Sequence, residues 1–478
     1  MSTCQISILS EDDIEQIHEN SLYLLMESGI KVGSAKALDI LEHGGASVNR
    51  DIMTAYLEEH MVNEAVKAMP KEIVLCARNP AQDMRSPRKG YPYMATNGTA
   101  VYTRDIDTGE KLMSMGKDLM DFSVLSDAID SIDYVWPIVT AHDGPEGGHA
   151  LNDFVISLKG TTKHFQGEGM SEREARDMVR VASAVVGGED ALAKRPIFSA
   201  IQCPICPLEF EQGSVEATME FARAGIPVVS MSMAICGLTS PVTIASTIAI
   251  ANAENLASFV ISQLAKPGAP VVYSSESSIM NMRTGEIKYG AIEEAILAAA
   301  AGQMAKHYGA PSMVSGFGVG LYGKVPGISS NVAEITFTAM TNLSLTDFAS
   351  GIGGLDQAKG ASLEQVVIDA DIWESIRDIR RDVMFDDDHF AADLIEEIGP
   401  GGNFLKSPHT LKNMRKELFV PSKEKSELYD LYRATSDQKA VVEQARQRVK
   451  KILAEHEPEP LDGDAERVID AIMSEYRR

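Results

Sequence analysis

The sequence predicts an α/β fold, a (βα)8 TIM barrel, on three observations: strict alternation of strand-like and helix-like runs, eight such units, and the composition of an ordinary globular protein. Hydrophobic residues make up 44% and charged residues 24% of the 478 residues. The expected strands are Tyr93–Asn97, Tyr134–Val139, Lys163–Glu168, Ile197–Gln202, Pro227–Met233, Pro270–Ser275, Ser312–Phe317 and Thr346–Ala349. Between them lie long helical runs.

The helical runs end with signals that fit parallel strands. Glycine follows three of the helices, at Gly225, Gly268 and Gly309, and proline then opens the next strand. Helices are expected at Glu172–Val186, Val215–Ala224, Val242–Leu264, Ile292–Tyr308 and Asn331–Leu343. Eight βα units can close into a barrel with no exposed edge, and an open doubly wound sheet is the alternative.

Two other regions flank the barrel. Residues 1–90 predict an N-terminal layer of helices and hairpins, because apolar residues recur at helical spacing from Glu11 to Met69 and strand-like runs follow. Residues 91–372 form the predicted catalytic barrel. Residues 373–478 are charged, show no strand pattern and predict a C-terminal helical extension, which is either a solvated cap or a subunit contact.

Charge excludes two classes of partner. Lys and Arg number 44 against 69 Asp and Glu, which gives a net charge of −25, so nucleic acid and anionic membranes are not expected partners. No N-terminal signal pattern and no apolar run of about 20 residues are apparent. Five scattered cysteines suggest reduced thiols, and we expect a cytoplasmic protein.

The carboxyl ends of the strands are where a barrel of this kind carries its active site. Two carboxylates, Glu168 and Glu276, end apolar strands, where burial would raise their pKa values. Each is an acid or base, a counter-ion to a cationic ligand, or a carboxylate that caps a helix. The other strand-end candidates are Asn97, Trp136, Gln166, Gln202, Cys203, Met231, Met233, Phe317, Tyr322, Asp347 and Phe348.

Several short motifs give weaker signals. Cys203 and Cys206 form a CxxC, but no second ligand pair accompanies them and prolines follow each, so neither metal binding nor redox chemistry is favoured. The histidines offer no metal triad, and we expect no metal site. The run from Gly316 through Gly318 to Gly320 lacks the full GxGxxG pattern, and its glycines more plausibly let a substrate or cofactor approach the backbone.

Two further features concern cofactors and covalent catalysis. Asp387-Asp388-His389 approaches the DxHxxG signature of cobalamin-carrying domains, but Ala392 replaces the glycine and no doubly wound domain could follow it. The chain is therefore not expected to carry cobalamin. Lys163 and Lys324 are the candidates for a Schiff base, although Lys163 begins its strand and points away from the mouth.

Three long runs resemble the trimethylamine:corrinoid methyltransferase superfamily. They are GLTSPVTIASTIAIANAENLASFVISQLAKPGAPVVY from Gly237 to Tyr273, MRTGEIKYGAIEEAILAAAAGQMAKHYGAPS after it, and EIGPGGNFLKSPHTLKNMRKELFVPS from Glu397 to Ser422. The resemblance covers about residues 10 to 453. It implies a barrel that presents a methylated amine to the cobalt(I) corrinoid of a separate small protein, with no cofactor bound by this chain.

The resemblance also bears on the substrate. The archaeal trimethylamine enzymes of this superfamily contain pyrrolysine, whereas this sequence has only the usual twenty residues. Members without pyrrolysine resemble quaternary amine methyltransferases. Glycine betaine is then the first expected substrate, with proline betaine, carnitine and butyrobetaine as others.

A quaternary ammonium suggests particular binding residues. Aromatic faces attract such a cation, so Trp136, Phe317, Tyr322 and Phe348 are candidates for a cage, with Glu168 or Glu276 as counter-charge. The carboxylate of a betaine needs donors, for which the candidates are Gln166, Gln202, Asn97, His164 and Arg283. The alternatives are a Schiff-base aldolase and a betaine-binding protein without catalysis. We expect a homo-oligomer.

Overall fold

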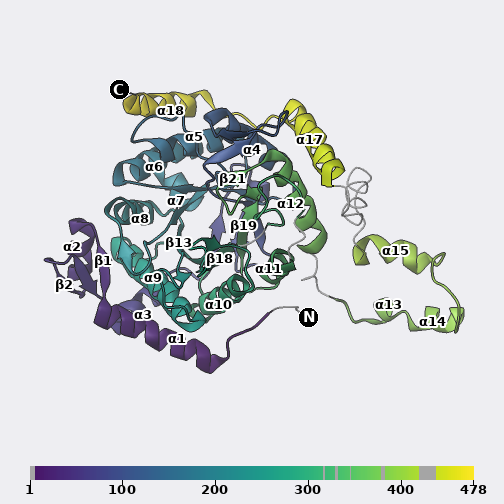
Figure 1. Cartoon of the computed structure of the whole chain (residues 1–478), viewed down its shortest axis with the longest axis horizontal. Helices are drawn as coiled ribbons and strands as arrows, with labels where there is room; N and C mark the ends of the chain where they lie inside the picture. The colour runs from purple at the N-terminus through teal and green to yellow at the C-terminus, as the bar shows by residue number, and fades with distance from the viewer. Residues whose placement is uncertain are drawn as a thin grey trace.

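Eight parallel strands close into a barrel at the centre of the molecule, seen end-on in Figure 1. The computed structural model describes residues 6–315, 318–328, 332–344, 346–377, 383–418 and 438–477. In barrel order the strands are β6 (Tyr93–Thr96), β9 (Tyr134–Val135), β10 (His164–Glu168), β11 (Phe198–Gln202), β13 (Val228–Ser232), β15 (Val271–Ser275), β18 (Ser312–Ser315) and β19 (Phe348–Ile352). The predicted barrel is confirmed, and the open sheet is wrong.

Helices follow the strands and cover the barrel from outside. They are α4 (Gly116–Ala128), α5 (His149–Gly160), α6 (Glu172–Val186), α7 (Glu189–Lys194), α8 (Gln212–Ala224), α9 (Ile244–Ala265), α10 (Ile292–Tyr308), α11 (Val332–Leu343) and α12 (Leu363–Ile376). Gly225 and Gly309 end α8 and α10 with φ of 74° and 62°, the left-handed conformation that the Gly-to-Pro helix exits predicted.

The last barrel strand differs from the prediction in a way that affects the site. It was expected at Thr346–Ala349 but runs from Phe348 to Ile352. Asp347 and Phe348 therefore lie at the start of the strand, not at its carboxyl end. Asp347 accepts hydrogen bonds there from the backbone N–H groups of Arg88 and Ser312, at 2.5 and 2.9 Å.

The inside of the barrel is packed, and its amino-terminal end is closed. A hairpin of β4 (Ile73–Leu75) and β5 (Met84–Ser86) places apolar side chains in the same cluster as the inward-facing residues of the barrel. The cluster contains Ile73, Leu75, Met84, Ala95, Tyr134, Trp136, Ile201, Val229, Met231, Val272, Met313 and Phe348. Access to the interior is thus left to the carboxyl ends of the strands, which we call the mouth.

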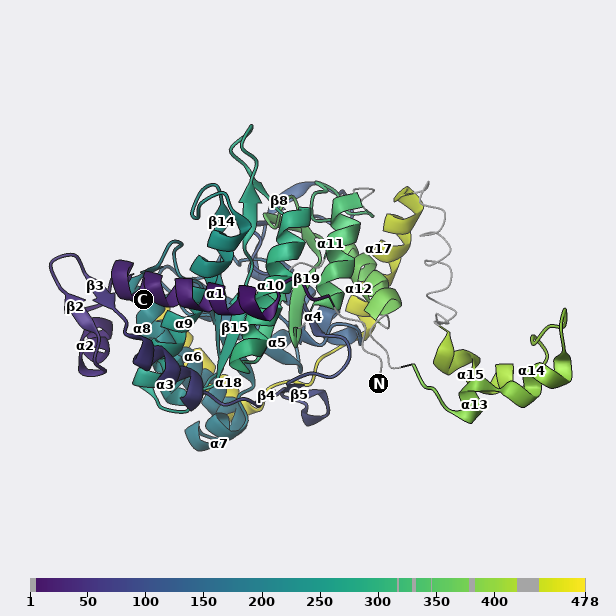
Figure 2. The ribbon, with the colours of Figure 1, turned by 90° about the horizontal axis from the view of Figure 1, so that it is seen from below.

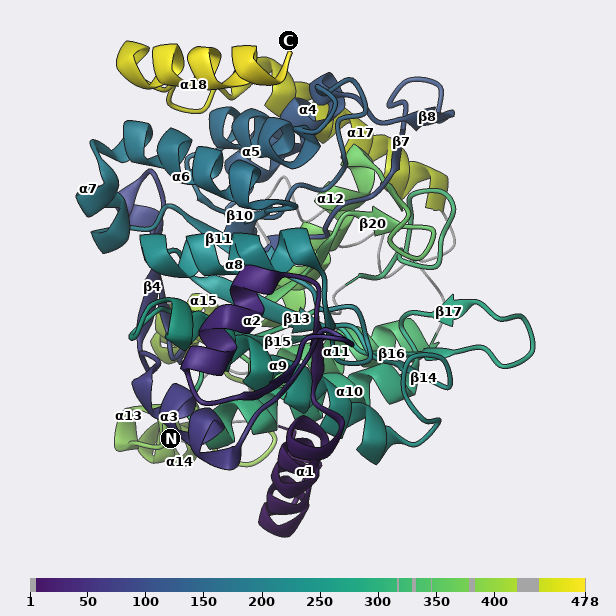
Figure 3. The same ribbon diagram turned by 90° about the vertical axis from the view of Figure 1, so that its left-hand side faces the viewer.

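Two small sheets rise around the mouth, built from loops that leave barrel strands. One contains β7 (Tyr102–Arg104), β8 (Lys111–Met113), β20 (Gly354–Leu355) and β21 (Gly360–Ala361). The other contains β14 (Ile235–Cys236), β16 (Ser278–Met280) and β17 (Ile287–Lys288). Figure 3 shows the loop between β16 and β17 projecting from the body of the molecule.

The N-terminal layer covers one side of the barrel. It contains α1 (Glu11–Tyr23), the π-helical turn Leu24–Ser28, β1 (Ile30–Val32), α2 (Ala35–His43), β2 (Ser47–Asn49), β3 (Thr54–Tyr56) and α3 (Glu59–Ala68). Helices α1, α2 and α3 pack on α9, and a barrel loop adds β12 (Glu209–Phe210) beside β1. The predicted limit at residue 90 precedes β6, whereas the predicted limit at residue 372 falls within α12.

The C-terminal region contains two different structures. Helices α17 (Gln438–Glu455) and α18 (Gly463–Tyr476) pack on the barrel helices, α17 against α12 and α4, and α18 against α6. Residues 383–418, with α13 (Asp387–Phe390), α14 (Ala392–Ile398) and α15 (Pro408–Glu417), instead extend away from the barrel as an arm (Figures 1 and 2).

Helix α9 is long and apolar enough to cross a membrane by length and composition alone, so the expectation that the chain has no such run is wrong. It lies instead between the barrel and the N-terminal layer, and 78% of its most apolar window is buried. Among the described helices, α9 is the one with this length and composition. Its packing is that of a core helix.

Lys163 is a buried structural residue. Its Nζ donates to the backbone oxygens of Ser126, Ile129 and Ile132 at 2.8, 2.7 and 2.7 Å, in the last turn of α4 and just after it. Burial lowers the pKa of Lys163 to about 8. The ammonium group is thus engaged beside the amino-terminal end of β10, away from the mouth, as the sequence predicted.

We predict that Lys163→Met destabilises the protein by about 3 kcal/mol or more, because three buried carbonyl groups lose their donor. Urea unfolding measures the change. The matched control is Lys159→Met, which removes a partly exposed ion pair with Glu466 and should cost less than about 1 kcal/mol. Equal effects of the two substitutions would contradict the assigned role.

Candidate functional site

Strand alternation decides which predicted residues face the interior. On β10 the side chain of Phe165 packs outward, 4.7 Å from the ring of Phe154 between ring centres. His164, Gln166 and Glu168 therefore point into the barrel, with Glu168 nearest the mouth. The side chains of β10 thus form a polar column from the closed end to the mouth.

Trp136 and Glu168 are in direct contact at the mouth. The indole Nε1–H donates to Glu168 Oε1 at 3.2 Å, and the Thr99 hydroxyl donates to the same oxygen at 3.4 Å. Gly98 lies against the indole ring, since a Cβ atom there would come within 2.1 Å of it. The backbone after β6 therefore fixes the ring that holds the carboxylate.

Glu168 has no basic partner among the residues that the structure describes. Burial raises the pKa of its carboxyl group, and the hydrogen bonds from Trp136 and Thr99 offset this only in part. In the described residues, no Lys or Arg takes part in shifting this pKa. A cation bound beside Glu168 would supply the missing counter-charge.

Other acidic groups surround the same opening. Cys203 is an exposed residue at this opening, yet desolvation of its thiol, with the nearby carboxylates of Glu168, Glu276 and Glu254, raises the pKa of the thiol well above its usual value. Burial likewise raises the pKa of Tyr289, to which Glu276 and Glu294 contribute. The pKa of Glu294 is itself raised by burial and by Glu276. The mouth thus gathers several acidic groups whose ionisation is disfavoured.

A narrow cleft of about 190 Å³ adjoins this mouth. It is lined by Thr99, Pro137, Thr140, His149, Ala150, Asp153, Phe154, Gly167, Glu168 and Met170. Burial, with the charge of Glu168 as a smaller contribution, raises the pKa of Asp153 to about 7. Asp153 Oδ1 accepts from the backbone N–H of Ala141 at 3.1 Å, so this carboxyl also positions the loop after β9.

Gln166 offers an unused donor inside the barrel. Its side chain is 1% exposed, and its Nε2 has no hydrogen-bond partner among the described residues. A buried amide without an acceptor is costly unless a ligand supplies one. Gln166 lies one inward position below Glu168 on β10.

Two predicted site residues lie elsewhere. Gln202 points outward, where it accepts from the Ser214 hydroxyl at 2.9 Å and donates to the backbone of Gly169. Phe348 lies at the closed end and stacks on Tyr93 with ring centres 5.7 Å apart. These positions remove Gln202 and Phe348 from the candidate site, because the first faces α8 and the second begins its strand.

Gly320 is likewise unavailable to a ligand. A Cβ atom at this position would lie 2.5 Å from the side chain of Gln365, so the space beside the glycine is already filled by α12. Gly318 has a φ of 156° and remains a predicted point of close approach. Gly316 and Phe317 lie outside the described residues. Tyr322 is half-buried in the loop after β18.

The other residues proposed to donate hydrogen bonds to a betaine carboxylate lie in different places. His164 has both ring nitrogens engaged, with the Cys76 carbonyl at 2.7 Å and the Ser199 hydroxyl at 3.0 Å. Burial lowers the pKa of His164 to about 4, so it stays neutral and structural. Asn97 is buried at the end of β6. Arg283 is exposed in the projecting loop between β16 and β17.

The two cysteines of the CxxC have separate environments. Cys206 donates to Glu254 Oε2 at 2.8 Å, and the Ser232 hydroxyl donates to the same oxygen at 2.5 Å. Cys203 is near the acidic groups of the mouth instead. The described residues include no cluster of three or more His, Cys, Asp or Glu able to hold a metal ion.

Sequence reasoning missed Thr99, Asp153, Tyr289, Glu254 and Glu294. A signal existed for the last two, because each is an acid within a largely apolar helix, and both side chains are buried. The signal did not say which strand end each carboxylate would face. That depends on how α9 and α10 pack on the barrel.

Comparisons with known proteins agree with this geometry. The trimethylamine methyltransferase (MTTB) family matches residues 2–478. A glycine betaine methyltransferase of Desulfitobacterium hafniense is 30% identical over 98% of this chain and 97% of its own length. A trimethylamine methyltransferase of Methanosarcina barkeri is 30% identical over 98% and 95%.

A solved structure shares the fold. The monomethylamine methyltransferase of Methanosarcina barkeri superposes with a TM-score of 0.54 and 10% identity, over 99% of this chain and 88% of that one. With an acidic mouth on a closed barrel and a family match over nearly its whole length, the chain belongs to the trimethylamine methyltransferase family of methyltransferases.

Proposed function

We propose that this enzyme moves a methyl group from a quaternary amine, glycine betaine foremost, to the cobalt(I) corrinoid of a separate small protein. The observation that carries the proposal is the mouth itself, where buried carboxylates and a tryptophan meet without a basic side chain among the described contacts of Glu168. Such a site is suited to a permanent cation. Proline betaine, carnitine and butyrobetaine have the same charged head.

The proposed reaction requires the methyl group to be positioned toward its acceptor and requires no proton transfer. The N–CH3 bond breaks with its electron pair left on nitrogen, which becomes a neutral tertiary amine. The acceptor cobalt(I) supplies both electrons of the new bond to carbon. Because no proton moves, Glu168 acts here as an anionic counter-charge, and the protein's task is to align the methyl group and exclude water.

Trp136 and Glu168 complement each other in this role. The indole can attract the ammonium through its π face, worth about 0.5 to 2 kcal/mol, while its N–H keeps the carboxylate in place. Attraction must stay moderate, because the positive charge on nitrogen disappears during transfer. Gln166, with its unused donor, is the candidate for the carboxylate of a betaine.

Exposed apolar side chains around the mouth support docking of the corrinoid protein there. They lie on loops that follow the barrel strands, on the side of β8 and β14 in Figure 2, and are Val101, Met113, Met170, Ile205, Leu238, Met282 and Val325. Apolar residues gathered on an exposed rim are typical of a protein contact. Cobalt(I) survives only under reducing conditions, which fits a cytoplasmic site of action.

The alternatives fare differently. The two candidate lysines do not support a Schiff-base aldolase. Lys163 is bound by three carbonyl oxygens, and Lys324 is exposed in the loop after β18. The family match also favours methyl transfer. A betaine-binding protein without catalysis would keep the acidic mouth, so it is the second candidate that the experiment must separate.

The deciding experiment mixes the purified enzyme with a corrinoid protein reduced to cobalt(I) and with single amines. Glycine betaine should produce methylcobalt absorbance and one equivalent of dimethylglycine, and trimethylamine should produce neither product. Calorimetry on the same samples measures binding. Betaine binding without methylcobalt would support the non-catalytic alternative, and absence of both for every quaternary amine would defeat the proposal.

We predict that Glu168→Gln raises the KM for betaine about tenfold or more, since removing one buried counter-charge costs on the order of 1.4 kcal/mol. Protonation of Glu168 has the same effect. Betaine affinity in the wild type should therefore increase as the pH rises through the raised pKa of Glu168, while the variant should keep only the change near pH 7 contributed by Asp153, which lines the same cleft. Steady-state kinetics measure the KM, and calorimetric titrations between pH 5 and about 8 measure the affinity and its pH dependence.

The matched control for this substitution is Glu216→Gln. Glu216 is also a buried carboxylate, but it accepts from Ser34 on the outside of the barrel at 2.7 Å. Its loss should leave the KM and the pH profile unchanged. Equal responses of the two variants would show that charge in general, and not Glu168, sets affinity.

For Trp136, we predict that Trp136→Leu weakens betaine binding about 5- to 30-fold, the equivalent of one cation–π contact of about 1 to 2 kcal/mol. Trp136→Phe keeps a π face but loses the donor to Glu168, so it should fall between the wild type and the leucine variant. Dissociation constants from calorimetry decide. A leucine variant with unchanged affinity would exclude the ring from the cage.

A further inference from the structure

The arm of residues 383–418 exposes an unusual number of large apolar side chains. Leu405 is 79% exposed and Leu411 is 70% exposed. The full set is Val383, Met384, Phe385, Phe390, Ile395, Phe404, Leu405, Leu411 and Leu418. Within the arm only Ser407 and Asn413 are buried.

The arm makes its polar contacts with itself. Lys412 pairs with Asp388 at 2.7 Å, and His409 lies 2.9 Å from the Asp388 carbonyl. Between the arm and the rest of the described chain no hydrogen bond or ion pair is found. An ordered segment with so much exposed apolar surface is stable only when something covers it.

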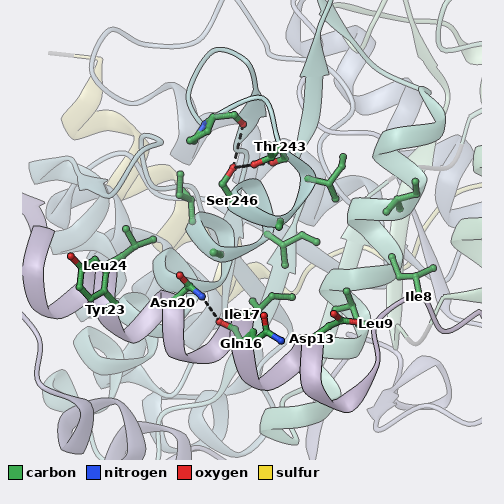
Figure 4. A pocket seen from close by; sticks show the side chains of 17 residues that line it. Ile8, Leu9, Asp13, Gln16, Ile17, Asn20, Tyr23, Leu24, Thr243 and Ser246 are labelled. Atoms are coloured by element: carbon green, nitrogen blue, oxygen red, sulfur yellow. Dashed lines mark hydrogen bonds between the residues drawn. The ribbon is translucent and has the colours of Figure 1, made fainter.

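An apolar groove on the opposite flank offers a matching surface. It lies between α1 and the start of α9, with a volume of about 790 Å³ (Figure 4). Its walls include Ile8, Leu9, Ile17, Ile244 and Ile248. The exposed side chain of Tyr23 lies at one end of the groove (Figure 4). The volume of the groove is large enough for apolar side chains from another segment.

Charge complements shape. Helix α1 is acidic, with Asp12, Asp13 and Glu19 exposed along the groove or next to its lining residues. Helix α15 carries Lys412, Arg415 and Lys416 against a single acid, Glu417. Leu411 and Leu418, seven residues apart, mark an apolar side of α15 and its end. The apolar side of α15, with its basic neighbours, is thus complementary to the apolar groove between α1 and α9, with its acidic neighbours.

We propose that α15 of one copy of this chain docks in the α1–α9 groove of a second copy. Figures 1 and 2 place the arm beside α12 and α17, whereas the groove lies on the side that carries α1. Reciprocal exchange of the two arms gives a twofold dimer in which each groove and each arm is covered once.

The position of the arm also decides against the corrinoid protein as its partner. In Figure 2 the arm lies level with the β4–β5 hairpin, at the closed end of the barrel, and not with β8 and β14 at the mouth. A methyl acceptor must reach the mouth. The inference therefore does not depend on the proposed function, and the dimer leaves both mouths open.

Photo-crosslinking of the full-length protein tests the contact. A benzoylphenylalanine replaces Leu411, and unlabelled and 15N-labelled copies are mixed before illumination. We expect crosslinked peptides that join the two isotopic forms and contain residues 8–24 or 241–250. Crosslinks within one copy, to another surface, or only after addition of a corrinoid protein would overturn the proposal.

Light scattering adds a second measurement. Leu405→Asp with Leu411→Asp should raise the dimer dissociation constant at least tenfold, while the control pair Ile52→Asp with Val468→Asp, which alters exposed apolar residues elsewhere, should leave it unchanged. Arg415→Glu with Lys416→Glu should weaken the dimer, and Asp12→Lys with Glu19→Lys should restore it. A monomeric wild type at micromolar concentration, or no rescue, would contradict the docking.

Discussion

The central constraint on this molecule is electrostatic. Closure of eight parallel strands brings Glu168 and Glu276 to one opening, and the packing of α10 places Glu294 near Glu276. Burial raises the pKa values of Glu168 and Glu254, and for Glu294 the neighbouring carboxylate of Glu276 adds to the effect of burial, so ionisation of these groups is disfavoured. The fold tolerates this cost because Trp136 and Thr99 hold Glu168 in place, and because the barrel walls are otherwise well packed.

The same closure explains why polar groups at opposite ends of the barrel differ in role. At the closed end every titratable group that we described is satisfied by the chain itself: His164 by a carbonyl and a hydroxyl, Lys163 by three carbonyls. Toward the mouth, Gln166 and Glu168 are left with unused hydrogen-bonding or charge capacity. Satisfied groups support the fold, and unsatisfied ones are available to a ligand.

Much of the fold could be predicted from sequence, because strand and helix periods and Gly-Pro exits are local signals. The pairing of Trp136 with Glu168 follows from their neighbouring strand ends. Phe348 was misplaced because a strand of small residues, Phe348–Ile352, extends past the predicted end. Gln202 and Gly320 were misread because outward or inward direction, and a neighbour such as Gln365, depend on packing between distant elements.

The β4–β5 hairpin has a kinetic consequence. Within the described residues, it closes the amino-terminal end of the barrel and leaves the mouth as the entrance to the interior. On the proposed chemistry, the corrinoid macrocycle bound over the mouth would prevent the amine or its product from leaving the barrel. The amine must then enter first and its demethylated product must leave last, which is a compulsory order of turnover dictated by architecture.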